Sequence, residues 1–129
     1  GGVIVFDRHQ IIARYNKQNG LVGDTVSYIY ESRDGAIWLA TRSGVSRLQN
    51  GTFTNYTTET GLSNQYVRDI YEDRDGVMWF GTYGGGLNRL KNGVISSITA
   101  KDGLSDDVVS RILVDDHDNF WMLGNQGVY

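Results

Sequence analysis

Three loop positions carry side chains that are suited to bind a polar ligand. Each lies four residues after one of the three tryptophans, and together they supply a guanidinium, a phenol ring and a carboxamide: Arg42, Tyr83 and Asn125. Asn64 and Tyr66 lie on a predicted connection between two sheets. A ring with a few polar groups around it suits sugars and similar ligands. We therefore predict that these five residues bind a ligand, and ordinary solvated loop side chains are the alternative.

Catalysis finds less support in the residue types. The two histidines, His9 and His117, fall on predicted hairpin turns, and the sequence has no Gly-x-Ser-x-Gly or zinc motif. Paired carboxylates would suit glycoside hydrolysis, and four aspartates are candidates: Asp24, Asp69, Asp106 and Asp107. Their spacing singles out no pair. We predict that the chain is not an enzyme, with a carbohydrate-active enzyme as an alternative.

The run Asp115-Asp116-His117-Asp118 has the residue types of a metal site. It lacks the spaced ligands and the glycine of a calcium loop, so we predict a surface turn without a metal. The chain has no cysteine, which excludes disulfides and thiolate metal sites. We predict no cofactor.

The composition argues against two classes of partner, nucleic acids and membranes. The net charge is −3 and the 12 basic residues are scattered, so no nucleic-acid partner is expected. Hydrophobic residues make up 40% of the chain, but none of their runs approaches 18 residues, so we expect no direct insertion into a membrane.

A repeat must position these side chains, because the tryptophans lie 41 and then 42 residues apart. In the repeat at 61–102, β-branched and aromatic runs alternate with Asp-Gly and Asn-Gly turns. The predicted strands are Val67 to Glu72, Met78 to Thr82, Leu87 to Leu90 and Val94 to Thr99. Four short antiparallel strands per repeat indicate a β-propeller blade. The predicted fold is all-β, with four-stranded antiparallel sheets and about three blades.

The apolar pattern around each tryptophan predicts burial. Residues 37–40, 78–80 and 120–123 are continuous apolar runs, whereas a strand with one wet face would alternate. Both faces of these strands should therefore be covered, and Trp38, Trp79 and Trp121 should pack in the core rather than stack on a ligand.

The units divide the chain into a single propeller segment. Residues 20–60 and 61–102 form complete repeats, 1–19 correspond to the outer two strands of a blade, and 103–129 to the inner two strands of another. Three blades do not close a ring, since propellers have four to eight. Open ends expose apolar faces and strand edges. We predict self-association into a closed ring, a dimer with six blades, and a segment of a longer propeller is the alternative.

The motif G-L-x₄-V-x₂-I-x-E-D-x-D-G-x-x-W-x-G-T resembles the two-component regulator propeller repeat. Residues 61–90 match it best, 20–48 match well, and 103–129 match in part. The resemblance implies a non-catalytic binding or sensor module from the extracytoplasmic, periplasmic part of a bacterial hybrid histidine kinase, with an oligosaccharide or similar compound as ligand. A structural, self-assembling propeller fragment without a ligand is the alternative.

Overall fold

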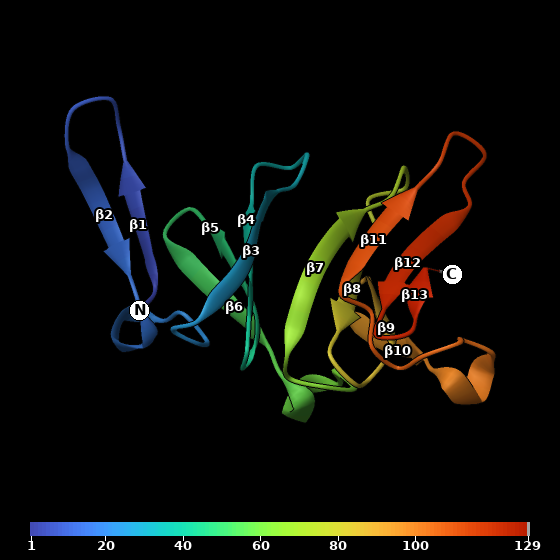
Figure 1. The fold of residues 1–129 in the computed structure, drawn as a ribbon. Coiled ribbons are helices and arrows are strands. Elements are labelled where there is room, and N and C mark those ends of the chain that lie inside the picture. Colours follow the sequence, from blue (N-terminus) through green and yellow to red (C-terminus); the bar gives the residue numbers. More distant parts are fainter. Residues whose placement is uncertain (129) are drawn as a thin grey trace.

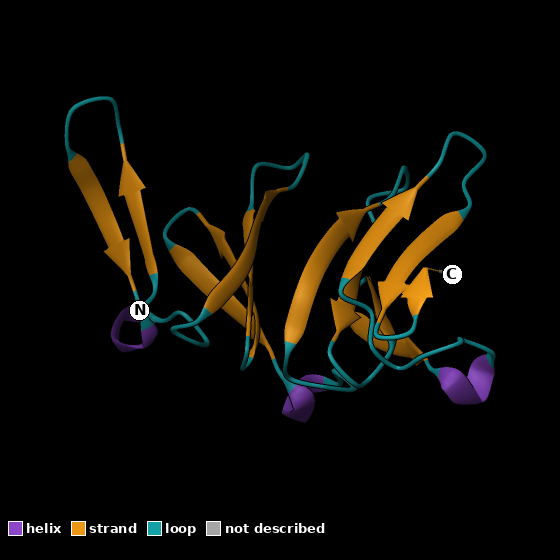
Figure 2. Ribbon diagram, viewed as in Figure 1, coloured by secondary structure: helices purple, strands orange, loops and turns teal. Residues whose placement is uncertain are grey.

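The computed structural model describes residues 1–128, and for Ile12 only the backbone. Tyr129, the end of the last predicted unit, lies outside the described residues. The chain folds into successive antiparallel sheets (Figures 1 and 2). The strands of these sheets are β1 (Val3–Phe6) and β2 (Ile11–Tyr15); β3 (Val26–Glu31), β4 (Ile37–Thr41), β5 (Gly44–Gln49) and β6 (Thr52–Tyr56); β7 (Val67–Glu72), β8 (Met78–Thr82), β9 (Leu87–Lys91) and β10 (Val94–Ile98); β11 (Arg111–Val114), β12 (Phe120–Gly124) and β13 (Gly127–Val128).

The sheet β7–β10 shows why the repeat folds as a blade. Its strands pair in chain order, and the predicted strand positions are confirmed to within one residue. The β9–β10 turn has positive φ at Asn92 (52°) and Gly93 (78°), the pattern that a two-residue hairpin needs. The predicted all-β propeller-blade class is therefore confirmed.

The sheets stack face to face, with β7 in contact with both β3 and β11 (Figure 1). One apolar cluster lies between the sheets β3–β6 and β7–β10 and includes Trp38, Val67 and Phe80. Phe80 is fully buried, and its ring centroid lies 5.9 Å from that of Trp38. A second cluster, with Leu87 and Val109, joins the sheet β7–β10 to β11–β13. Sheet stacking thus supplies the core, and a buried Phe side chain contributes about 1.5–3 kcal/mol.

The prediction that all three tryptophans are core residues is wrong for Trp121. Trp38 is 4% exposed, Trp79 is half-buried against Phe120, and Trp121 is 50% exposed. The three occupy equivalent strand positions, but Trp121 lies on a face of β11–β13 that no other described sheet covers. It shares that apolar surface with Leu113, Leu123 and Val128. The burial of each tryptophan depends on whether a neighbouring sheet covers it, and the local apolar run does not predict that.

The hairpin β1–β2 lies at one end of the row of sheets (Figure 1), and the ring of Tyr15 on β2 contacts that of Phe53 on β6, with centroids 5.5 Å apart. Ile4 and Phe6 on β1 are 55% and 64% exposed, and Ile11 on β2 is also exposed. The two ends of the described chain therefore each present apolar side chains to solvent.

Three one-turn 3₁₀ helices, which the sequence reading did not predict, connect each sheet to the next: η1 (Lys17–Asn19), η2 (Thr58–Thr60) and η3 (Ala100–Asp102). Each has an Asn or Thr N-cap with a reciprocal capping box, and each ends on a glycine with positive φ. These short helices connect the last strand of one sheet to the first strand of the next.

Candidate functional site

The loop that carries Tyr83 is fixed by backbone hydrogen bonds. The Tyr83 N–H donates to the Tyr66 carbonyl at 2.8 Å, and Tyr83 forms an isolated bridge with Val108. The N–H groups of Gly84 and Gly86 donate to the Asp107 carbonyl at 3.2 and 2.7 Å. The connection entering the next sheet therefore holds this loop in place.

The connection that carries Tyr66 is also pinned. The Tyr66 N–H donates to Asn64 Oδ1 at 2.8 Å, which closes a turn through a side chain. The Ser63 hydroxyl donates to the Gly85 carbonyl at 2.6 Å, and the fully buried Asn88 donates from Nδ2 to Ser63 Oγ at 2.7 Å. Buried, satisfied polar groups of this kind rigidify the structure around them. Both loops are thus preformed.

Two tyrosines and two arginines meet on these loops. The ring centroids of Tyr66 and Tyr83 lie 5.5 Å apart at an angle of 36°. Arg42 places Cζ 5.1 Å from the Tyr66 centroid, and Arg68 places Cζ 5.4 Å from Tyr66 and 5.7 Å from Tyr83. All three distances fall in the range of cation–π attraction. We call Arg42, Tyr66, Arg68 and Tyr83 the tyrosine–arginine cluster.

The cluster is open to solvent. Tyr83 is 43% exposed and Arg42 is exposed, whereas Tyr66 and Arg68 are half-buried. Arg42 comes from the β4–β5 turn of one sheet, and the other three come from the sheet β7–β10 or the connection that leads into it. The arrangement can present the exposed Tyr83 ring and two guanidinium groups to a ligand at the junction of two sheets.

The structure places the five predicted site residues unequally. Arg42, Tyr66 and Tyr83 are in contact, and Asn64 positions Tyr66 through its side chain. Asn125 lies in the β12–β13 turn, where its N–H donates to Asp106 Oδ2 at 2.8 Å. Within residues 1–128, no hydrogen bond or ring contact joins Asn125 to the cluster. That these residues bind a ligand stays a prediction.

Arg68 was missed by the sequence reading. It lies where the β7–β8 pairing shifts register between Val67 and Asp69, so the chain bulges at this residue. The equivalent residues of the other repeats are Ser27 and Ser110. The sequence signal for this residue was that the other repeats carry serine where this repeat carries arginine.

The four aspartates considered for catalysis bind backbone N–H groups. Each accepts a hydrogen bond from a main-chain N–H: Asp24 from Lys17 (2.8 Å), Asp69 from Ile112 (2.7 Å), Asp106 from Val108 (3.0 Å) and Asp107 from Ala100 (2.6 Å). Burial raises the pKa of Asp69, against the opposing effect of the Ile112 N–H. The Val108 N–H holds the pKa of Asp106 below its usual value. Among residues 1–128, no contact joins two of these carboxylates into a catalytic pair.

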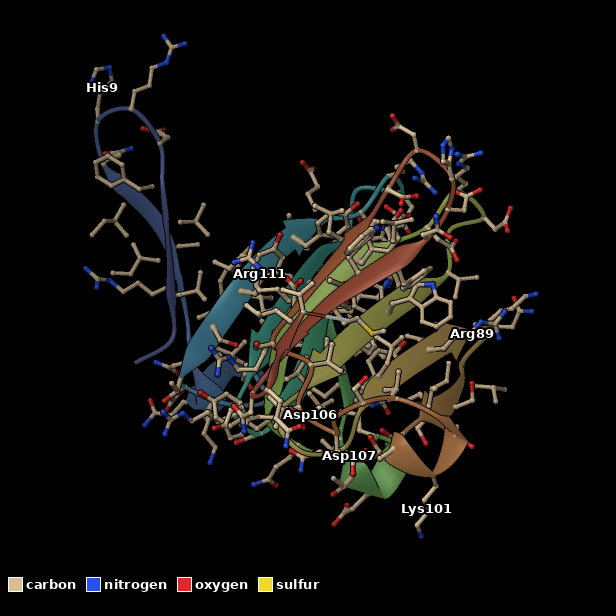
Figure 3. The ribbon with its side chains drawn as sticks, turned by 45° about the vertical axis from the view of Figure 1, so that its right-hand side comes forward. His9, Arg89, Lys101, Asp106, Asp107 and Arg111 are labelled. Carbon is tan, nitrogen blue, oxygen red and sulfur yellow. The ribbon has the colours of Figure 1, made fainter. Side chains whose placement is uncertain are left out.

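The acidic run at 115–118 forms a turn around one carboxylate. Asp115 accepts hydrogen bonds from the Trp121 indole N–H at 2.9 Å and from the backbone N–H groups of His117 and Asn119. The indole bond, followed by the backbone bonds, lowers the pKa of Asp115 to about 2. The second histidine, His9, lies at the tip of the β1–β2 hairpin, far from Asp106 and Asp107 (Figure 3).

Comparison with family models gives two matches, at residues 20–43 and 61–84, both to the family described as two component regulator propeller. The chain contains two-component regulator propeller repeats. The first matched repeat carries Arg42, and the second carries the rest of the tyrosine–arginine cluster. The cluster is therefore built where two regulator propeller repeats meet.

Solved structures share the fold. The extracellular domain of a hybrid two component system from B. thetaiotaomicron is 23% identical, with a TM-score of 0.87 over 99% of this chain and 18% of that chain. A second such domain from B. thetaiotaomicron is 25% identical, with a TM-score of 0.78 over 98% of this chain and 20% of that chain. PorZ of Porphyromonas gingivalis, a surface component of the type-IX secretion system, is 15% identical, with a TM-score of 0.67 over 95% of this chain and 18% of that chain. The chain thus spans about a fifth of each of these structures.

No curated protein matches the chain. Among the described residues, no helix is both long and apolar enough to span a membrane.

Proposed function

We propose that this chain is a non-catalytic, ligand-sensing part of an extracytoplasmic two-component sensor, and that the tyrosine–arginine cluster binds an oligosaccharide. The observation that carries the proposal is the partly exposed Tyr66–Tyr83 pair with Arg42 beside it, on loops fixed by hydrogen bonds. A preformed site loses less conformational entropy on binding, which favours affinity.

The chemistry of the cluster suits sugars. A pyranose ring has apolar C–H faces that pack on aromatic rings, and its hydroxyl groups accept hydrogen bonds from guanidinium N–H groups. The likeness to extracellular domains of hybrid two component systems supports a location outside the cytoplasm, and we propose the periplasm. Catalysis is not proposed, because the aspartates near the loops are engaged with backbone amides.

A second role, self-association, is supported by the apolar surfaces at the two ends of the described chain. Ile4 and Phe6 are exposed at one end, and Trp121 and Val128 at the other. Exposed apolar surfaces that gather large side chains mark association sites. We propose that two chains associate through these surfaces in a closed ring of six blades, a scaffold that would exist with or without a ligand.

A glycan array tests the binding proposal. The 129-residue chain, Tyr83→Ala and Tyr83→Phe are applied to the same array, and the melting temperature of each is measured. We expect the chain to bind a set of oligosaccharides, Tyr83→Phe to retain these hits because it keeps the ring, and Tyr83→Ala to lose them with little change in melting temperature. An array without hits, or equal hits for the chain and Tyr83→Ala, would contradict the proposal.

A further inference from the structure

We infer that the ligand of the tyrosine–arginine cluster carries an anionic group, a carboxylate or a sulfate, that the arginines of the cluster bind. This inference rests on the proposed function for its location and adds the chemical class of the ligand, an acidic oligosaccharide. It starts from two positive charges that converge on one ring, since both guanidinium groups lie within 5.4 Å of the Tyr66 centroid.

The two arginines of the cluster have no ion pair among the described residues, whereas most of the other arginines do. Four other arginines have a carboxylate within ion-pair distance: Arg33 with Glu72, Arg47 with Asp34, Arg74 with Asp118 and Arg111 with Asp69. Among the residues that the structure describes, neither Arg42 nor Arg68 has an ion pair, and neither side chain donates a hydrogen bond. Each guanidinium has five N–H donors, and a tyrosine face satisfies none of them as an oxygen would.

The carboxylates in the connections that lead into β3 and β11 accept hydrogen bonds from backbone groups. Asp24 accepts from the Lys17 N–H and Asp107 from the Ala100 N–H. Asp106 accepts from the N–H groups of Val108 and Asn125. These hydrogen bonds fix the acidic side chains in the connections between sheets. The chain as a whole carries a net charge of −3, so the positive pair is a local feature rather than a sign of a basic protein.

An anion would relieve this local imbalance. Neither guanidinium of the cluster has a carboxylate partner among the described residues, and an oxyanion would give it charge-assisted hydrogen bonds. The planar fork of arginine matches carboxylate and sulfate oxygens in pairs. The Tyr83 ring, which is 43% exposed, would pack against the sugar ring itself. A uronic acid or a sulfated sugar supplies both parts in a single unit.

Paired ligands that differ only in charge test the inference. Calorimetric titrations of the 129-residue chain use a short oligogalacturonide and its carboxyl-reduced neutral form, and then a sulfated oligosaccharide and its desulfated form. We expect an acidic member to bind on the order of tenfold more tightly than its neutral partner at low salt, and the difference to shrink as salt is added. The pair that shows the difference identifies the carboxylate or the sulfate as the recognised group.

Variants locate the effect. Arg68→Gln should weaken acidic binding on the order of tenfold and leave neutral binding unchanged, while Arg68→Lys, which keeps the charge, should lose less. Arg14→Gln, an exposed arginine on β2, is the matched control and should change neither. Neutral ligands that bind as tightly as acidic ones would overturn the inference and leave oligosaccharide binding intact. Absence of binding by all four ligands would count against both, and equal effects of Arg68→Gln and Arg14→Gln would overturn the assigned site.

Discussion

The tryptophans offer a test of how sheet stacking stabilises the chain, through Trp38→Ala and Trp121→Ala. Trp38 is 4% exposed, and its ring centroid lies 5.9 Å from those of both Tyr56 and Phe80. Its indole N–H donates to Ser32 Oγ at 2.9 Å. Truncation would leave an enclosed cavity, so we expect a loss of about 3–5 kcal/mol in the free energy of unfolding.

Trp121 occupies the equivalent position on β12 but is 50% exposed. Its truncation removes about half of the buried area and opens to solvent, so we expect a loss of only about 1–2 kcal/mol. Each variant also loses one indole hydrogen bond, to the buried Ser32 hydroxyl or to the partly exposed Asp115 carboxylate. The expected difference between the variants is therefore about 2–3 kcal/mol.

Urea unfolding followed by far-UV circular dichroism measures both losses, at a protein concentration where light scattering reports a monomer. Trp79→Ala should fall between the two, because Trp79 is half-buried against Phe120. Equal losses for Trp38→Ala and Trp121→Ala in the monomer would refute the idea that burial by a neighbouring sheet sets the contribution of each tryptophan.

Three further predictions concern a loop, an acidic turn and the assembly. Gly86 has a φ of 76°, and a Cβ there would clash with the Ile98 carbonyl oxygen, whereas Gly93 has a similar φ and open space. In urea unfolding, Gly86→Ala should therefore lower the free energy of unfolding by about 1–3 kcal/mol more than Gly93→Ala does, and equal losses would contradict the clash. The pKa of Asp115 is about 2 in the folded chain and 3.8 for an unperturbed aspartate, so the stabilisation by this carboxylate is present above pH 3.8 and is lost as the pH falls toward 2. The melting temperature should therefore fall more steeply in this window for the chain than for Asp115→Asn, and parallel curves would contradict the assignment. Deletion of residues 1–19 should abolish a closed dimer in light scattering and promote aggregation, and a monodisperse monomer of the intact chain at high micromolar concentration would contradict self-association.

Local signals in the sequence predicted the strands well, for physical reasons. The β9–β10 hairpin follows from Asn92-Gly93, which adopts positive φ at low cost, flanked by residues that favour strands. The 3₁₀ helices also had a local signal, as in Thr57-x-x-Thr60-Gly61, where each Thr caps a backbone N–H of the other and Gly61 supplies positive φ. The sequence therefore contained a signal for these helices, although they were not predicted.

Contacts between sheets could not be predicted in the same way. Trp121 has the same apolar neighbours in sequence as Trp38, but its burial depends on whether another sheet stacks on β12. The meeting of Arg42 with Tyr66 depends on how the turn of one sheet faces the connection of the next, which the sequence places on one face without fixing a distance. Arg68 enters the cluster through a bulge, and a bulge changes the direction of a side chain without a distinctive residue pattern.

Amide chemical shifts test the central proposal most directly, because they report where on the isotope-labelled chain a ligand binds. The acidic oligosaccharide with the highest affinity is added while the backbone amide signals are followed. We expect the largest shifts at Tyr66, Arg68 and Tyr83, with smaller ones at Arg42 across the sheet junction. Shifts confined to residues outside the tyrosine–arginine cluster, such as the exposed strand β10, would contradict the assignment of the ligand site.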